Sequence, residues 1–177
     1  MKKITMMLAM QGIVLLFVSF AIGEIIEPDG FKELKWGMTT EQAREKGVLV
    51  GEGSKGKEFI LFVGKGETVG NVEVRVGYVF YENKLGSVLL DFHKNDFSTI
   101  KRALTDKYGE PSKIEEIKNV YGNPIGVTYR WDKPNTVITL KFNQAKGDCK
   151  LVYQYKPLVM KGVEKSLKES EKAKGDL

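Results

Sequence analysis

Two neighbouring stretches of alternating apolar residues place the strongest constraint on the fold of this 177-residue chain. Between residues 72 and 80 every second side chain is apolar, and the alternation resumes at Val88, Leu90 and Phe92. A period of two is typical of a strand with one buried face, and Asn83-Lys84 between the stretches favours a tight hairpin turn. The centre of the chain is therefore predicted to be an antiparallel hairpin.

Two segments with helical spacing flank this hairpin. Thr39-Thr40-Glu41-Gln42 is a capping box, which predicts a helix from about Thr40 to Lys46 that ends at Gly47. Residues 96–108 carry an apolar stripe at helical spacing, and Gly109 follows this stripe as a helix stop.

Further alternating segments predict strands on both sides of the second helix. Trp131 shares the parity of Val127 and Tyr129 in one of them, and Trp36 ends another, so both rings are predicted to be core or rim anchors. The expected strands cover about residues 31–36, 58–63, 113–120, 126–131, 136–142 and 149–156.

The order of these elements, a helix followed by an antiparallel meander, occurs twice. It predicts an α+β protein with a twisted antiparallel sheet of about seven or eight strands, two helices on one face and two similar halves. The other face of the sheet is expected to lie in water. We assign residues 24–30 to a linker, 31–157 to a single domain and 158–177 to a charged tail that is partly disordered or helical.

The first 23 residues have the composition of an export signal. Lys2 and Lys3 precede an apolar run from Ile4 to Ile22, and Ala21-Ile22-Gly23 has small residues where a signal peptidase reads them. We predict cleavage before Glu24 and a periplasmic or extracellular location. An uncleaved membrane anchor is the alternative, because about 19 apolar residues approach the length that spans a bilayer.

Composition narrows the function further. A single Cys and a single His exclude a disulfide framework and a multi-Cys or multi-His zinc site, and we expect no metal and no cofactor. The net charge of +5 includes Lys2 and Lys3 of the leader. The mild excess of positive charge that remains without the leader does not favour a nucleic-acid partner. The expected partner is a protein or a cell-envelope component, with membrane contact only through an uncleaved leader.

Short motifs at the two helices resemble the SmpA/BamE and β-lactamase-inhibitor-like superfamily of small exported bacterial domains. Trp36-Gly37-Met38-Thr39 with Gln42-Ala43 is similar to the G-M-T-x-x-Q-V helix start of that group, and Gly109-Glu110-Pro111 is similar to its G-x-P helix end. The resemblance implies helices packed on a curved antiparallel sheet, a BLIP/TBP-like layout, and a role in assembling or inhibiting other proteins without catalysis. The closer likeness is to uncharacterised exported bacterial proteins with the same Trp-Gly-Met-Thr start.

Residues 51–57 contain the glycine spacing of phosphate-binding loops. Such a loop needs a strand before it and a helix after it, so that the amides of the helix face the anion. Here a strand is expected to follow, and Glu58 stands where a P-loop has its Ser or Thr. The segment is therefore interpreted as a mobile Gly-rich loop without a phosphate site.

Ser87, Asp91 and His93 occur in an order that suggests a hydrolytic triad. A strand rises about 3.3 Å per residue, which places Ser87 and His93 roughly 20 Å apart and beyond hydrogen-bond reach. Asp91 and His93 remain as a solvent-facing pair, and a hydrolase built on them is one alternative function. Cys149 shares its parity with Leu151 on the expected buried face, opposite His93, and is interpreted as a packing residue.

The solvent-facing side of the sheet carries the candidate binding site. Strand parity gathers large charged and amphipathic side chains there, and Arg and Tyr are residues that anchor protein interfaces. The candidate residues are Arg75, Tyr81, Asp91, His93, Arg130 and Lys141. We expect a non-enzymatic protein that binds its partner through this face. A small-ligand or lipid carrier, with a cavity between the helices and the sheet, is the other alternative.

Overall fold

The computed structural model describes residues 26–56, 59–144 and 147–175, so the predicted leader lies outside the described residues. No helix in the described part of the chain is long and apolar enough to cross a membrane. The elements in chain order are β1 (Gly30–Phe31), β2 (Leu34–Lys35), α1 (Thr40–Glu45), β3 (Leu49–Lys55), β4 (Phe59–Gly64), β5 (Glu67–Val69), β6 (Val72–Tyr81), β7 (Lys84–Phe92), a 3-10 turn η1 (Lys94–Asp96), α2 (Phe97–Tyr108), β8 (Lys113–Lys118), β9 (Pro124–Asp132), β10 (Thr136–Asn143), β11 (Asp148–Tyr155) and α3 (Lys156–Gly175).

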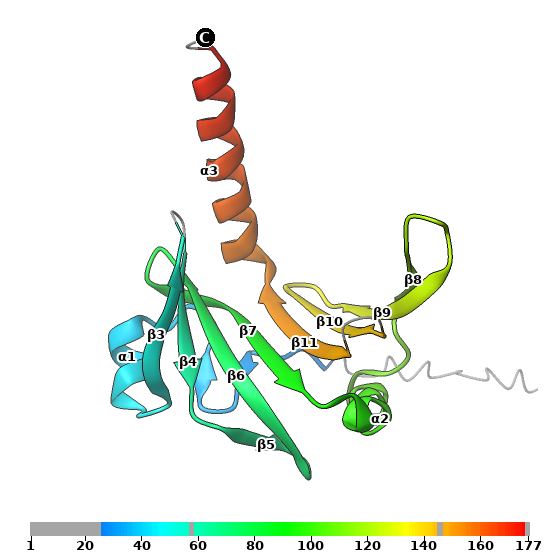
Figure 1. The fold of residues 1–177 in the computed structure, drawn as a ribbon. Coiled ribbons are helices and arrows are strands. Elements are labelled where there is room, and N and C mark those ends of the chain that lie inside the picture. Colours follow the sequence, from blue (N-terminus) through cyan, green and yellow to red (C-terminus); the bar gives the residue numbers. More distant parts are fainter. Residues whose placement is uncertain (1–25, 57–58, 145–146, 176–177) are drawn as a thin grey trace, which may run out of the picture.

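One large antiparallel sheet organises the molecule (Figure 1). It has nine strands in the order β3-β4-β6-β7-β11-β10-β9-β8, with the short β5 paired to β6. Each half consists of a helix followed by a meander, and the last strands of the two meanders, β7 and β11, pair at the centre. This topology confirms the predicted α+β fold with two similar halves.

The core lies on the inner face of the sheet, where α1 and α2 pack. Every second residue of β6 from Val72 to Phe80 is buried, as the alternation predicts. Ile100, Leu104 and Tyr108 of α2 belong to the same apolar cluster as Ala43 of α1. Residues 30–35 form a small separate hairpin of β1 and β2, because Lys32 adopts a left-handed φ of 52° that reverses the chain within the expected strand.

The turn between β6 and β7 is held against the start of α1. The predicted capping box is present, because Thr39 and Gln42 each bind the backbone N–H of the other. The Asn83 side chain accepts a hydrogen bond from the Thr40 backbone N–H at 3.2 Å and donates one to Glu41 Oε2 at 3.0 Å. These contacts join the first helix to the central hairpin.

Glu41 should make the stability of this junction depend on pH. The hydrogen bond from Asn83, with backbone and threonine donors, lowers the pKa of Glu41 from 4.5 to about 2. A carboxyl group with a lowered pKa in the folded state contributes stability above pH 4.5, and this contribution is lost as the pH falls toward 2. Melting curves between these two pH values should therefore show a smaller loss of stability for Glu41→Gln than for the wild type. Glu45→Gln, on the same helix, is the matched control, and its melting temperature should fall with pH as steeply as that of the wild type. If the melting temperatures of all three proteins fell equally with pH, Glu41 would not be the source of the pH dependence.

The glycine-rich segment is the main local difference from the sequence prediction. Leu49–Lys55 forms the edge strand β3 instead of a loop, and it pairs with β4 through two register shifts. Pairing with the apolar strand β4 overcomes the low strand propensity of Gly and Ser in this segment. The segment is followed by the strand β4, as the sequence predicts.

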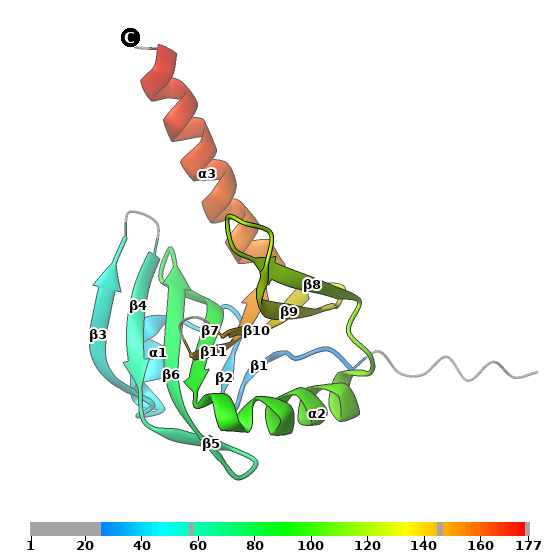
Figure 2. The same ribbon diagram turned by 45° about the vertical axis from the view of Figure 1, so that its right-hand side comes forward.

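The outer face of the sheet is partly covered, which differs from the expectation of a fully solvated face. The charged C-terminal segment forms α3, which begins directly after β11. A Cβ atom at Gly162 of α3 would lie 3.3 Å from the Tyr81 ring, and one at Gly86 of β7 would lie 3.2 Å from Leu158 of α3. Ser87 and Val79, on the same part of this face, are buried. Beyond its first turns α3 projects away from the sheet (Figures 1 and 2).

Candidate functional site

Strand register brings three of the six candidate residues into one row across the outer face. Arg75 of β6 is paired with Asp91 of β7, and Asp91 is paired with Lys150 of β11. Lys150 is in turn paired with Lys141 of β10. We call this set of four side chains, Arg75, Asp91, Lys150 and Lys141, the charged row.

The other three candidate residues lie apart from the charged row. Arg130 belongs to the next row of the sheet, paired with Thr139, and both its Nε and Nη2 atoms donate to Asp132 Oδ2. Tyr81 lies at the far end of β6, where its ring contacts Phe59 and the first turns of α3. His93 follows the last residue of β7 and is exposed.

The charged row carries more positive than negative charge. Lys150 Nζ lies 3.9 Å from Asp91 Oδ1, which is a long and exposed ion pair. Among the described residues, no carboxylate lies within 4 Å of Arg75 or Lys141. Arg75 and Lys141 therefore lie at the two ends of the row, on either side of the long ion pair between Asp91 and Lys150. Both exposed cations are available to an anionic group.

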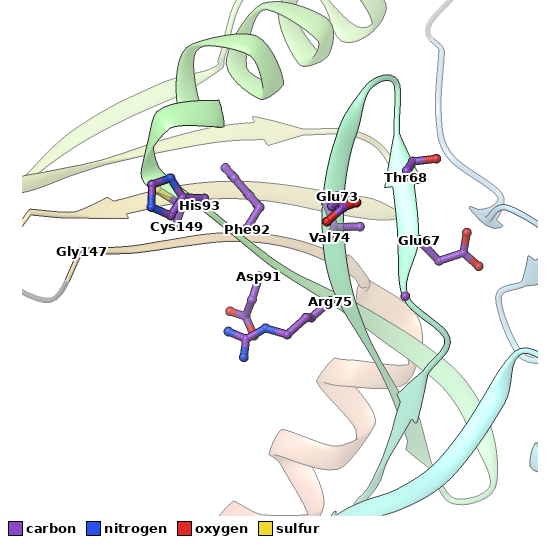
Figure 3. A pocket seen from close by; sticks show the side chains of 11 residues that line it. Glu67, Thr68, Glu73, Val74, Arg75, Asp91, Phe92, His93, Gly147 and Cys149 are labelled. Atoms are coloured by element: carbon purple, nitrogen blue, oxygen red, sulfur yellow. The ribbon is translucent and has the colours of Figure 1, made fainter.

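A cavity of about 800 Å³ opens at the Arg75 end of the charged row. It exists because β6 and β7 pair only from Arg75 and Asp91 onward, so that Glu73 and Val74 diverge from Phe92. In Figure 3, Arg75 and Asp91 point to one side of the sheet and Phe92 points to the other. The cavity is thus lined by side chains of both faces at an interruption in the sheet.

Sequence reasoning missed the part of this cavity that the β5–β6 hairpin supplies. Glu67 and Thr68 line it, in a segment that lies outside the predicted strands. Val69 and Val72 pair across Gly70-Asn71, and Gly70 adopts a left-handed φ of 64°. A Gly-Asn dipeptide between two β-branched residues is a hairpin signal that identifies this element in the sequence.

His93 has a structural role at the start of η1. Its Nδ1 atom accepts a hydrogen bond from the Asn95 backbone N–H at 3.3 Å, and it thereby caps the turn that leads into α2. Asp91 and His93 both line the cavity, and no ion pair of 4 Å or less joins them in the described part of the chain. Ser87 is buried near α3 and lies 3.5 Å from the Tyr81 hydroxyl.

Cys149 is buried, as its parity with Leu151 predicts, and it is paired in register with Phe92. It lines the same cavity as His93, because side chains of both faces of the sheet line this cavity. The thiol is only 1% exposed, so a dissolved molecule has almost no access to it.

Within the described ranges, no group of three or more His, Cys, Asp or Glu residues is arranged to hold a metal ion. The cavity combines the aromatic ring of Phe92, the carboxylates of Glu67, Glu73 and Asp91, and the exposed cation of Arg75. One of these acids, Glu67, forms an ion pair with Lys32. This arrangement can bind an anionic group at the rim and an apolar group beside Phe92.

Fold and site together define an α+β protein with an open antiparallel sheet and a charged outer face. The chain belongs to a family described as "Uncharacterised protein", whose model matches residues 31–174. The match extends from β1 to within one residue of the end of α3. No curated protein and no solved structure matches the chain.

Proposed function

We propose that this protein is an exported, non-catalytic binding protein that recognises an acidic partner through the charged row. The observation that carries the proposal is the exposure of Arg75 and Lys141 without a carboxylate within 4 Å of either. A solvated sheet face is expected to be polar, and here three of the four residues in the row are cations. Clustered cations attract a negatively charged surface and fix its orientation.

The cavity beside Arg75 adds a place for an anchoring group. Phe92 and Val74 supply apolar surface, and an aromatic or aliphatic side chain of the partner would be removed from water there. The proposed partner is therefore a protein or cell-envelope component that presents acidic groups next to an apolar one.

Two features of the sequence support the location and the type of function. The apolar segment that follows Lys2 and Lys3 has the pattern of an export signal, which favours the periplasm or the extracellular space. The helix motifs resemble those of the SmpA/BamE and β-lactamase-inhibitor-like superfamily, in which the known roles are the assembly or inhibition of other proteins. A shared binding role would explain both the open sheet face and the charged row.

Reversing the charge of Arg75 and Lys141 should abolish capture of the partner. In an affinity capture from cell-envelope extract, with the chain from Glu24 onward as bait, the double variant Arg75→Glu/Lys141→Glu should retain less than about a tenth of the wild-type signal. The melting temperature should stay within a few degrees, because both side chains are exposed and form no ion pair of 4 Å or less in the described structure. Capture should also weaken as salt is raised, because exposed charges are screened.

The matched control is Arg102→Glu, a charge reversal of the same kind on the exposed side of α2, on the inner side of the sheet. It should leave capture unchanged. Arg130→Glu should have a smaller effect than the double variant, because Arg130 is already paired with Asp132. Normal capture by Arg75→Glu/Lys141→Glu would remove the proposal.

A further inference from the structure

A second cavity lies on the opposite side of the sheet, between α2 and the inner face. Its volume is about 560 Å³, within the range of small-molecule sites in proteins. One wall is α2, the floor is β11, and the chain that leads into β1 closes a further side. Figure 2 shows this N-terminal chain running alongside α2.

The segment before β1 is fixed in place by hydrogen bonds to the rest of the fold. The Pro28 carbonyl accepts one from Trp36 Nε1 at 2.8 Å and one from Thr136 Oγ1 at 3.3 Å. The Glu27 carboxylate accepts one from the Asn135 backbone N–H at 2.5 Å. The wall is therefore a defined part of the structure, and the cavity behind it has a preformed shape.

The interior of this cavity is mainly apolar. Its deeper residues are Ile100, Leu104 and Tyr108 of α2 and Leu151 and Tyr153 of β11, all of them buried. Burial, together with a hydrogen bond to Tyr108, raises the pKa of Tyr153. The phenol is therefore neutral at physiological pH, and the floor of the cavity carries no charge.

The carboxylates that line the cavity already have partners. Glu27 accepts a hydrogen bond from Asn135, and Asp29 forms an ion pair with Lys35. The lining cation Lys32 also has a partner, because it forms an ion pair with Glu67, which lies outside the cavity. The hydrogen bond from Lys35 is the main cause of the lowered pKa of Asp29, and the attraction of Lys107 contributes least. Lys107 is the lining cation that forms no such ion pair within the described residues.

Lys107 stands at the rim of the apolar cavity. Its Nζ atom lies 5.3 Å from the centre of the Tyr108 ring, and no carboxylate of the described residues lies within 4 Å of it. An ammonium group beside an apolar cavity is complementary to a molecule with one anionic end and an apolar body.

We propose that this cavity binds a small amphiphile, with its carboxylate or similar anionic group at Lys107 and its apolar body between α2 and β11. The site is independent of the charged row, which lies on the other face of the sheet. It makes the protein a ligand carrier or a ligand-dependent binding protein in addition to its proposed function.

Calorimetric titration with decanoate, and with decanol as the uncharged probe of equal chain length, tests the proposal. The protein is expressed from the complete sequence, so that any processing of the N-terminus occurs as it does in the cell. The wild type should bind one decanoate per chain, at least about tenfold more tightly than decanol. Lys107→Ala should weaken decanoate binding about tenfold and leave decanol binding unchanged.

Ala103→Phe should abolish binding of both probes by filling the cavity. Ala103 lines the cavity yet is exposed on α2, so the larger ring can enter the space without displacing the buried core. Arg102→Ala, on the same helix and outside the cavity, is the matched control and should bind like the wild type. Circular dichroism and the melting temperature confirm that each variant is folded.

Three results would overturn the proposal. The first is the absence of saturable binding to the wild type. The second is unchanged binding to a folded Ala103→Phe variant, which would place the probe elsewhere. The third is equal affinity for decanoate and decanol in the wild type, which would leave Lys107 without a role. None of these results bears on capture through the charged row.

Discussion

Replacing Trp131 with alanine should lower the free energy of unfolding by about 4 kcal/mol. Trp131 is 1% exposed on the inner face of β9, and its indole Nε1 donates a hydrogen bond to the Gly109 carbonyl at 2.7 Å. The ring thus ties the second meander to the end of α2, and its removal leaves a large void that rigid strands cannot fill. Urea denaturation followed by far-ultraviolet circular dichroism measures the effect as a lower midpoint at an unchanged slope.

Trp131→Phe separates the two contributions of the ring. Phenylalanine retains much of the apolar volume and loses only the hydrogen bond and part of the packing, so we expect a loss of about 1–2 kcal/mol. A loss below about 1 kcal/mol for Trp131→Ala would show that the ring is not part of a well-packed core. It would also remove the argument that α2 is anchored to the sheet through Gly109.

Elements that depend on local periodicity could be predicted from the sequence. The alternation from Val72 to Phe80 gave the buried face of β6 because a strand with one solvated side has a strict period of two. The capping box at Thr39 and Gln42 gave the start of α1, because its hydrogen bonds join residues only three positions apart. The order of helices and meanders then gave the fold class.

Elements that depend on distant partners could not be predicted in this way. Leu49–Lys55 is a strand because β4 lies beside it, and its own residues favour a loop. The partial cover of the outer face comes from α3, which is more than 70 residues from Gly86 along the chain and has no wide apolar stripe to indicate where it packs.

The candidate site shows the same division. Parity indicated that Arg75, Asp91 and Lys141 share a face, and the structure places them there. Their alignment into one row with Lys150 depends on the register of four strands, two of which come from each half of the chain. Parity did not indicate the capping role of His93, which follows the last residue of β7 and accepts a hydrogen bond from the Asn95 backbone N–H.

Gly86 is the position through which the docking of α3 can be tested. It is the extra residue of a bulge in β7, where Val79 is paired with Ser87 and Phe80 with Leu85. A Cβ atom there would lie 2.6 Å from the Tyr81 ring and 3.2 Å from Leu158 Cβ. The absence of a side chain therefore allows Tyr81 and the first turn of α3 to pack against the central hairpin.

Replacing Gly86 with leucine should destabilise the protein by about 3 kcal/mol. The new side chain has no space, and the strain is relieved only if the Tyr81 ring turns away or α3 leaves the sheet. We expect α3 to leave, because the Tyr81 ring also packs against the ring of Phe59. Hydrogen exchange should then accelerate in residues 156–162, while the amides of β9 and β10 retain their protection.

A double-mutant cycle shows whether the strain arises at Tyr81. In a Tyr81→Ala background the added leucine can occupy the space of the ring, so Gly86→Leu should cost less than about half of its effect in the wild type. Additive losses would mean that the glycine is required by the bulge itself and not by the packing of Tyr81 and α3.

The same variants connect the fold to the proposed function, because α3 covers the end of the outer face that carries Tyr81 and leaves the charged row open. Release of α3 should therefore enlarge the exposed face without loss of capture at Arg75 and Lys141.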